Sequence, residues 1–139
     1  VAEAVASGKA FETMKKWIAA QGGNAAALED FSLLPQASVH YKLKAPRSGY
    51  LAHMDAQKIG EASAILGAGR QKKEDSIDYA AGIVLRKKTG DRVEAGETLA
   101  ELWTNQEKSV ADSEAEFLSA LVWGEEAPQH QPLVLGVIR

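Results

Sequence analysis

The sequence predicts an α+β fold, in which a helical segment precedes a mixed domain of short antiparallel strands and helices. Apolar residues between Ala10 and Ile18 recur with the spacing of a helix. From Val39 onward, apolar and polar residues alternate as they do in strands, and turns rich in glycine are frequent. The change of pattern predicts a boundary that separates a helical segment, 1–36, from an α+β domain, 37–139.

Composition restricts the class of protein. The 139 residues are 45% hydrophobic and 25% charged, which is the balance of an ordinary globular protein. A net charge of -3 argues against nucleic acid as a partner, and no apolar run is long enough to cross a membrane. The sequence has no cysteine, which excludes a disulfide framework and thiolate metal sites and fits the cytoplasm, where we expect the protein to act.

The first helix is expected to begin at Ser7 as its N-cap and to end at the glycines of residues 21–24. Residues 25–29 predict one further turn, and residues 31–36 an irregular connector. The helix carries one apolar stripe, formed by Phe11, Met14, Trp17 and Ile18. Because an isolated helix of this length is marginal in water, we expect this stripe to need a partner surface outside the segment.

In the second domain, strands are expected at residues 39–44 and 50–54, joined by a turn at 46–49. Asp55 is expected to cap a helix that ends at Leu66. The remaining expected elements are strands around Ile77, at 82–85 and at 98–103, a turn at 88–91, a helix over 110–121 and a closing strand at 132–138.

Residues Gly67, Ala68, Gly69 and Arg70 allow two interpretations. Glycines let a backbone approach a phosphate, which Arg70 would clamp. However, these glycines follow a helix and so lie at its negative end, whereas phosphate sites use the positive end. We therefore expect a C-terminal turn in which both glycines adopt positive φ and Arg70 pairs with Asp75 or Asp78.

Other polar and aromatic residues are given structural roles. Asp75, Asp78 and Asp91 are expected in turns or caps, and the histidines (His40, His53, His130) lack the spacing of metal ligands. The basic residues Lys42, Lys44 and Arg47 predict a solvated face. Three strand aromatics, Tyr41, Tyr50 and Trp103, are expected to be part of a core.

Residues 90–99 resemble a hairpin of biotinyl and lipoyl carrier domains, with two tight turns around a buried Val93. A working carrier also needs a lysine at the tip of an exposed hairpin. The nearest candidate, Lys58, falls inside an expected helix. A stand-alone binding or carrier-like module is therefore the alternative hypothesis, since a fold does not determine a function.

The order of motifs along the chain resembles the C-terminal part of the pyrimidine-nucleoside phosphorylases, the family that includes thymidine phosphorylase. Each motif is weak alone, but together they cover nearly the whole chain. They comprise residues 7–11, 21–23, 33–36, 45–50, Asp55 with 59–60, 66–70, 75–82 and 90–96.

The resemblance implies that 1–36 is the end of a central α/β domain and that 37–139 is a C-terminal domain with a barrel-sandwich-like hairpin. It implies a homodimeric glycosyltransferase that uses phosphate to split a pyrimidine nucleoside into free base and pentose 1-phosphate, without a cofactor. The family's phosphate and base motifs lie earlier in its sequence. We therefore expect no catalytic, substrate-binding or metal-binding residue here, and an inactive chain that needs the remainder of its polypeptide as partner.

The first residue is Val1 rather than methionine. One interpretation is the removal of an initiator or tag. The other is that the sequence is a C-terminal piece of a longer protein.

Overall fold

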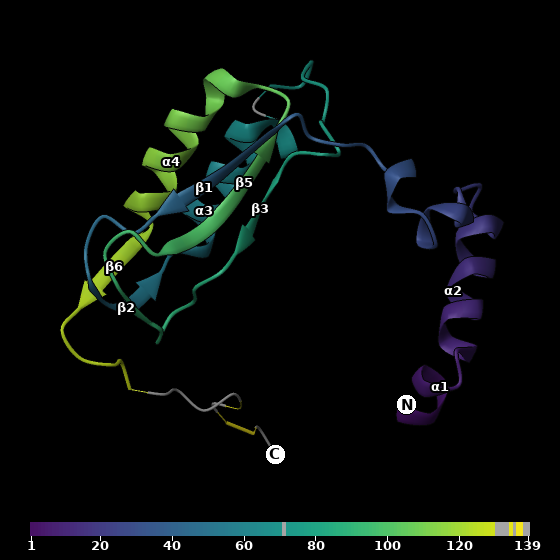
Figure 1. Ribbon diagram of the computed structural model, residues 1–139, viewed down its shortest axis with the longest axis horizontal. Helices are drawn as coiled ribbons and strands as arrows, with labels where there is room; N and C mark the ends of the chain where they lie inside the picture. The colour runs from purple at the N-terminus through teal and green to yellow at the C-terminus, as the bar shows by residue number, and fades with distance from the viewer. Residues whose placement is uncertain (71, 130–133, 135, 138–139) are drawn as a thin grey trace. The chain divides into compact units, whose positions relative to one another are not determined.

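The computed structural model describes residues 1–70, 72–129, 134 and 136–137. The chain divides into two compact units, Val1–Gln36 and Ala37–Arg139 (Figure 1). The first unit is helical, and the second combines helices with antiparallel sheets. The predicted α+β class is therefore confirmed.

The first unit consists of two helices and two short 3₁₀ turns. These are α1 (Ala2–Ala6), α2 (Lys9–Ala20), η1 (Ala25–Leu28) and η2 (Phe31–Leu33). The prediction of Ser7 as N-cap of the long helix was wrong, because Ser7 ends α1 and Gly8 caps α2 with φ +76°. Only glycine adopts that left-handed conformation cheaply, so Gly8 separates the two helices. Gly22, with φ +78°, follows the end of α2 as expected.

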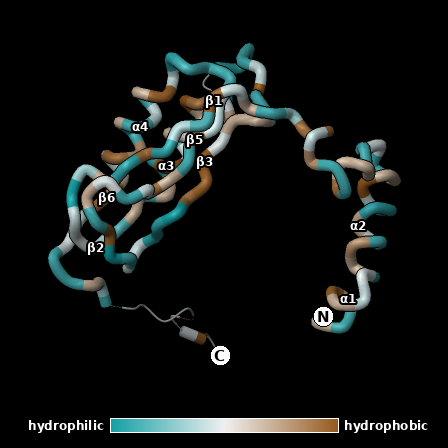
Figure 2. The backbone as a smooth tube through the Cα atoms, viewed as in Figure 1, coloured by the Kyte–Doolittle hydropathy of each residue, from teal (hydrophilic) through white to brown (hydrophobic). Residues whose placement is uncertain are grey.

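The apolar stripe of α2 is not covered within the first unit. Ala27, which lies outside α2, is the only buried residue of the first unit. Within the stripe, Phe11, Met14 and Trp17 are 41%, 44% and 61% exposed. Hydrophobic residues alternate with hydrophilic ones along this helix (Figure 2). The unit is instead tied by polar contacts, in which Lys15 Nζ lies 3.0 Å from Glu12 and 2.9 Å from Glu29.

The second unit contains two three-stranded antiparallel sheets, with strand orders β1-β5-β3 and β4-β2-β6. Its strands are β1 (Val39–Lys44), β2 (Gly49–Met54), β3 (Gly82–Leu85), β4 (Arg92–Val93), β5 (Thr98–Thr104) and β6 (Leu121–Gly124). Its helices are α3 (Ala56–Ser63), the π-helical turn η3 (Ala64–Ala68), the 3₁₀ turn η4 (Glu107–Ser109) and α4 (Val110–Ser119).

One hydrophobic core joins the sheets to the helices. Leu43 and Leu102 come from β1 and β5, Leu51 from β2, Leu66 from η3 and Phe117 from α4, and all five are fully buried. Helices α3 and α4 lie along β1 and β5 (Figure 1). The alternation of residues 39–44 therefore places Leu43 on the face of β1 that packs against the helices.

Two of the secondary-structure elements expected in this unit were wrong. No strand forms at Ile77. The expected helix over 110–121 ends at Ser119, and Leu121 begins β6, where it pairs with Met54 of β2. This pairing joins residues far apart in sequence, so helical periodicity did not reveal it. The expected strand at 132–138 lies outside the described residues, apart from 134 and 136–137, which are not in a strand.

Helix α3 begins and ends largely as predicted. The carboxylate of Asp55 accepts hydrogen bonds from the backbone N–H groups of Gln57 and Lys58, at 2.9 and 3.3 Å, and so caps the helix. The helix then widens into η3, and Gly67 turns the chain with φ +106°. Gly69 has φ -141°, which is extended backbone, so the expectation of positive φ at both glycines was wrong for Gly69.

Replacement of Gly67 by alanine should destabilise the second unit by about 1–3 kcal/mol, because a side chain is strained at this φ. The added Cβ would also lie 3.1 Å from Gln106 Nε2. Gly60 in α3 is the matched control, since it has open space around it and ordinary helical geometry. Gly60→Ala should be neutral or stabilise the helix by up to about 1 kcal/mol. Urea unfolding followed by circular dichroism measures both, and equal stability of the two variants would contradict this account.

Candidate functional site

The glycine turn after α3 borders a polar hollow of about 290 Å³. The end of η3 forms one wall, and Asp75, Ser76 and Gln106 contribute polar groups. These residues come from the loop after η3 and from the segment that follows β5, so the fold brings together parts of the chain separated by about 30 residues. This hollow is the candidate site that the sequence pointed to.

The backbone at this turn is already engaged. Leu66 O accepts a hydrogen bond of 2.7 Å from the Thr104 hydroxyl, and Gly67 O accepts one of 2.9 Å from Asp78 N. These carbonyls belong to the negative end of the helix, which disfavours an anion. The geometry therefore supports the interpretation of the glycines as a C-terminal turn rather than a phosphate cradle.

The acidic residues near the turn have the local roles expected of turn aspartates. Asp75 accepts from Lys72 N at 2.8 Å, and Asp78 accepts from Ala80 N at 2.9 Å and from Asn105 Nδ2 at 3.0 Å. Asp91 accepts from Lys88 N at 2.8 Å. The expected ion pair of Arg70 with Asp75 or Asp78 is not found among the described residues.

No group of histidine and acidic side chains suited to a metal ion occurs in the described part of the chain. His40 lies in β1 and His53 in β2, and His130 lies outside the described residues. Within the same part of the chain, every helix is too short or too polar to cross a bilayer.

The carrier-like alternative depends on an exposed lysine, and Lys58 does not provide one. It lies in α3, where its Nζ is 3.3 Å from the Ser119 hydroxyl and 3.4 Å from the Ser119 carbonyl. Strand β5, which follows the Gly90–Gly96 turns, leads into η4 and α4. Strand β4 pairs with β2, whereas β5 pairs with β1 and β3, so residues 90–99 are divided between two sheets.

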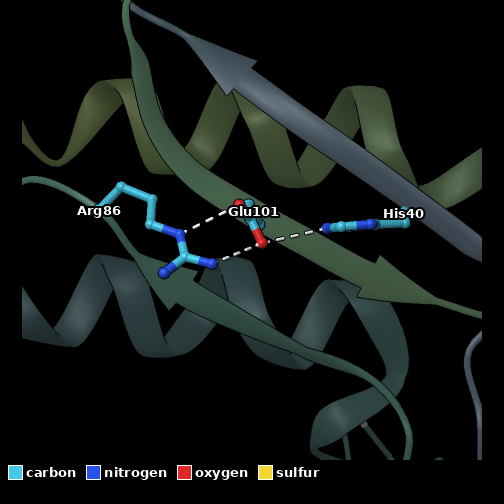
Figure 3. A network of polar contacts seen from close by, with 3 residues as sticks. All are labelled: His40, Arg86 and Glu101. Carbon is cyan, nitrogen blue, oxygen red and sulfur yellow. Dashed lines mark hydrogen bonds and ion pairs between the residues drawn. The ribbon is translucent and has the colours of Figure 1, made fainter.

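A charged network that the sequence did not reveal crosses the sheet β1-β5-β3. Glu101 of β5 receives two hydrogen bonds of 3.0 Å from Arg86, from Nε and Nη2, and lies 3.2 Å from His40 Nε2. Arg86 and His40 approach the carboxylate from opposite sides (Figure 3). The network therefore links the segments of all three strands around one carboxylate that is only 13% exposed.

The predictions of Tyr50 and Trp103 as core aromatics were wrong, whereas Tyr41 does pack against the core. Trp103 is half-buried and stacks on the His40 ring, with ring centres 3.7 Å apart and planes at 23°. His40 and Trp103 are directly opposite in the β1–β5 pairing. The sequence showed the alternation within each strand, but it did not show the strand register that makes His40 and Trp103 neighbours.

The network makes stability depend on pH. The Arg86 guanidinium, aided by His40, lowers the pKa of Glu101 below its ordinary 4.5. A lowered carboxylate pKa means that the folded state favours the charged form, so the stabilisation is present above pH 4.5 and is lost as the pH falls through the folded pKa. Arg86→Gln should therefore reduce the loss of stability between pH 7 and pH 3.

The urea midpoint measured across that range tests this expectation. Arg92→Gln is the matched control, because Arg92 pairs with Glu94 at the surface, where both side chains are more than half exposed. The control should retain the pH dependence of the unaltered chain. An unchanged pH dependence in Arg86→Gln would contradict the assigned role of Arg86.

Comparison with known proteins places this chain in a family. Residues 50–122, just over half of the chain, match the family described as "Pyrimidine nucleoside phosphorylase C-terminal domain". A pyrimidine-nucleoside phosphorylase of Geobacillus stearothermophilus is 45% identical over 106 residues, which are 76% of this chain and 24% of the relative. A Bacillus subtilis (strain 168) enzyme of the same name is 46% identical over 105 residues, with the same coverage.

The chain thus spans about a quarter of the length of the curated relatives it matches. The matched segment includes both sheets' central strands, β5 and β2, together with α3, the glycine turn and α4. This extent of agreement shows that the chain belongs to the family of pyrimidine nucleoside phosphorylase C-terminal domains.

Proposed function

We propose that this chain is the C-terminal part of a glycosyltransferase that cleaves pyrimidine nucleosides with phosphate, releasing the free base and a pentose 1-phosphate. The observation that carries the proposal is the 45% identity over 106 residues to an enzyme named pyrimidine-nucleoside phosphorylase. The unit Val1–Gln36 is proposed to be the end of the central α/β domain, and Ala37–Arg139 the C-terminal domain.

The chain's own residues are proposed to be structural and to hold none of the catalytic or substrate-binding groups. The polar groups around the glycine turn support this, because Asp75, Asp78 and Thr104 bind the chain's own backbone, and Asp78 also binds the Asn105 side chain. Phosphorolysis needs phosphate and nucleoside held together in one preorganised site, and such positioning accounts for about 7–11 kcal/mol of a barrier. A domain without the remainder of that site is therefore expected to be inactive.

The remainder of the polypeptide is the proposed partner, within a homodimeric cytoplasmic enzyme. The uncovered stripe of α2 supports this, because Phe11, Met14 and Trp17 remain exposed within their unit. Burial of one such side chain contributes about 1.5–3 kcal/mol, so a surface that covers all three would stabilise the helix strongly. We place that surface in the preceding part of the enzyme.

A chimera tests the proposal. The segment of the Geobacillus stearothermophilus enzyme that aligns with this chain is replaced by the chain, and phosphate-dependent release of thymine or uracil is measured. The chimera should release base, whereas the isolated chain and the relative lacking its aligned segment should not. A folded but inactive chimera, or base release by the isolated chain, would contradict the proposal.

A further inference from the structure

We infer that the outer face of the sheet β1-β5-β3 binds the part of the phosphorylase polypeptide that precedes this chain. The outer face is defined here by seven residues: His40, Lys42, Gly82, Val84, Arg86, Glu101 and Trp103. The inference rests on the proposed function and names a surface of this chain that would contact the remainder of the enzyme.

Strand register brings these residues together. His40, Trp103 and Gly82 form one row across the three strands, because His40 and Gly82 each pair with Trp103. Lys42, Glu101 and Val84 form the next row in the same way. Residues directly opposite in antiparallel strands share a face, so both rows lie on one side of the sheet.

The opposite side of this sheet packs against the core, whereas side chains of the outer face remain exposed among the described residues of the unit. Leu43 and Leu102 are fully buried, and Ile83 and Leu85 pack against the same core. On the outer face, Val84 is 43% exposed, and the Arg86 side chain is 53% exposed. A Cβ added at Gly82 would meet no atom within 4 Å, so open space lies beside the Trp103 indole.

The polar groups of the outer face are arranged to donate. Both oxygens of Glu101 are engaged by Arg86 and His40, as Figure 3 shows. The indole N–H of Trp103 has no acceptor among the described residues, but it is buried and so is not itself open to a partner. Lys42 has no ion pair in the described part of the chain.

Counting His40 as neutral, the outer face has a net charge of +1, from Lys42 and Arg86 against Glu101. The whole chain, by contrast, carries -3. A fitting partner therefore presents carboxylate or carbonyl acceptors around an apolar side chain that fills the space over Gly82. Tryptophan and arginine are typical of the residues that dominate protein interfaces.

The preceding polypeptide is the occupant that the observations favour. The match covers 24% of the Geobacillus stearothermophilus relative, so about three-quarters of that enzyme lies outside it. Such a partner is covalently joined to the domain, and linkage gives it a high effective concentration at any face it can reach. A modest mixed surface of this kind suits an interface between domains of one chain.

Gly82→Phe in the chimera described above tests the inference. The substitution fills the open space beside Trp103, and the residue has no positive φ that would strain a side chain. In the chimera it should lower kcat/KM at least tenfold and separate the thermal unfolding of the C-terminal unit from that of the remainder. In the isolated chain, circular dichroism should show no loss of stability.

Gly60→Phe is the matched control, because Gly60 also has open space but lies on α3. It should leave the chimera's activity and unfolding unchanged. An active chimera in which Gly82→Phe behaves like Gly60→Phe would overturn the inference alone, and an inactive parent chimera would overturn the proposed function and the inference with it. Self-association of the isolated chain that Gly82→Phe abolishes would assign the face to a second copy, which also overturns the inference.

Discussion

The buried hydrogen bond from the Thr104 hydroxyl to Leu66 O, 2.7 Å long, is the interaction on which the second unit most depends. A helix end leaves carbonyls without intrahelical partners, and buried carbonyls must be matched. Thr104 of β5 donates to Leu66 O in this way, and Ser113 of α4 donates to Ala62 O, one turn earlier in the helix, at 2.8 Å. Both hydroxyl-bearing side chains are fully buried. The end of one helix is therefore fixed to a strand and to a second helix at once.

The surroundings of the glycine turn follow from this arrangement. The Thr104 oxygen also accepts from Gln106 N at 2.9 Å, so the same hydroxyl directs the chain out of β5 toward α4. Gly67 then turns the backbone so that its carbonyl meets Asp78 N. The hollow beside the turn is thus a product of helix termination. It lies at the negative end of α3, where the helix dipole disfavours an anion.

Local features of the fold were predictable from the sequence, and nonlocal ones were not. Asp55 and Gly67 act within a few residues of themselves, so a capping residue before an apolar stripe identified the start of α3, and the glycine after the stripe identified the turn that follows it in η3. Leu121 joined β6 because Met54 lies opposite it, and that pairing spans most of the domain.

The candidate site shows the same limit. The turn roles of Asp75 and Asp78 could be read from their neighbours, whereas the Arg86–Glu101–His40 network and the outward position of Trp103 depend on strand register. A one-residue change of register would move each of these side chains to the other face. The family of the chain came from the resemblance of its motifs, which the comparisons support, because neither periodicity nor charge identifies a family.

Thr104→Val tests the central role of the buried hydroxyl most directly. Valine keeps the shape of the side chain but leaves Leu66 O and Gln106 N without their partner, so urea unfolding should show a loss of about 1–3 kcal/mol. Thr98 lies in β5 like Thr104, but its hydroxyl makes only an exposed contact with Lys44 Nζ of β1. Thr98→Val should therefore lower the free energy of unfolding by less than about 0.5 kcal/mol. Equal stabilities of the two variants would contradict the account.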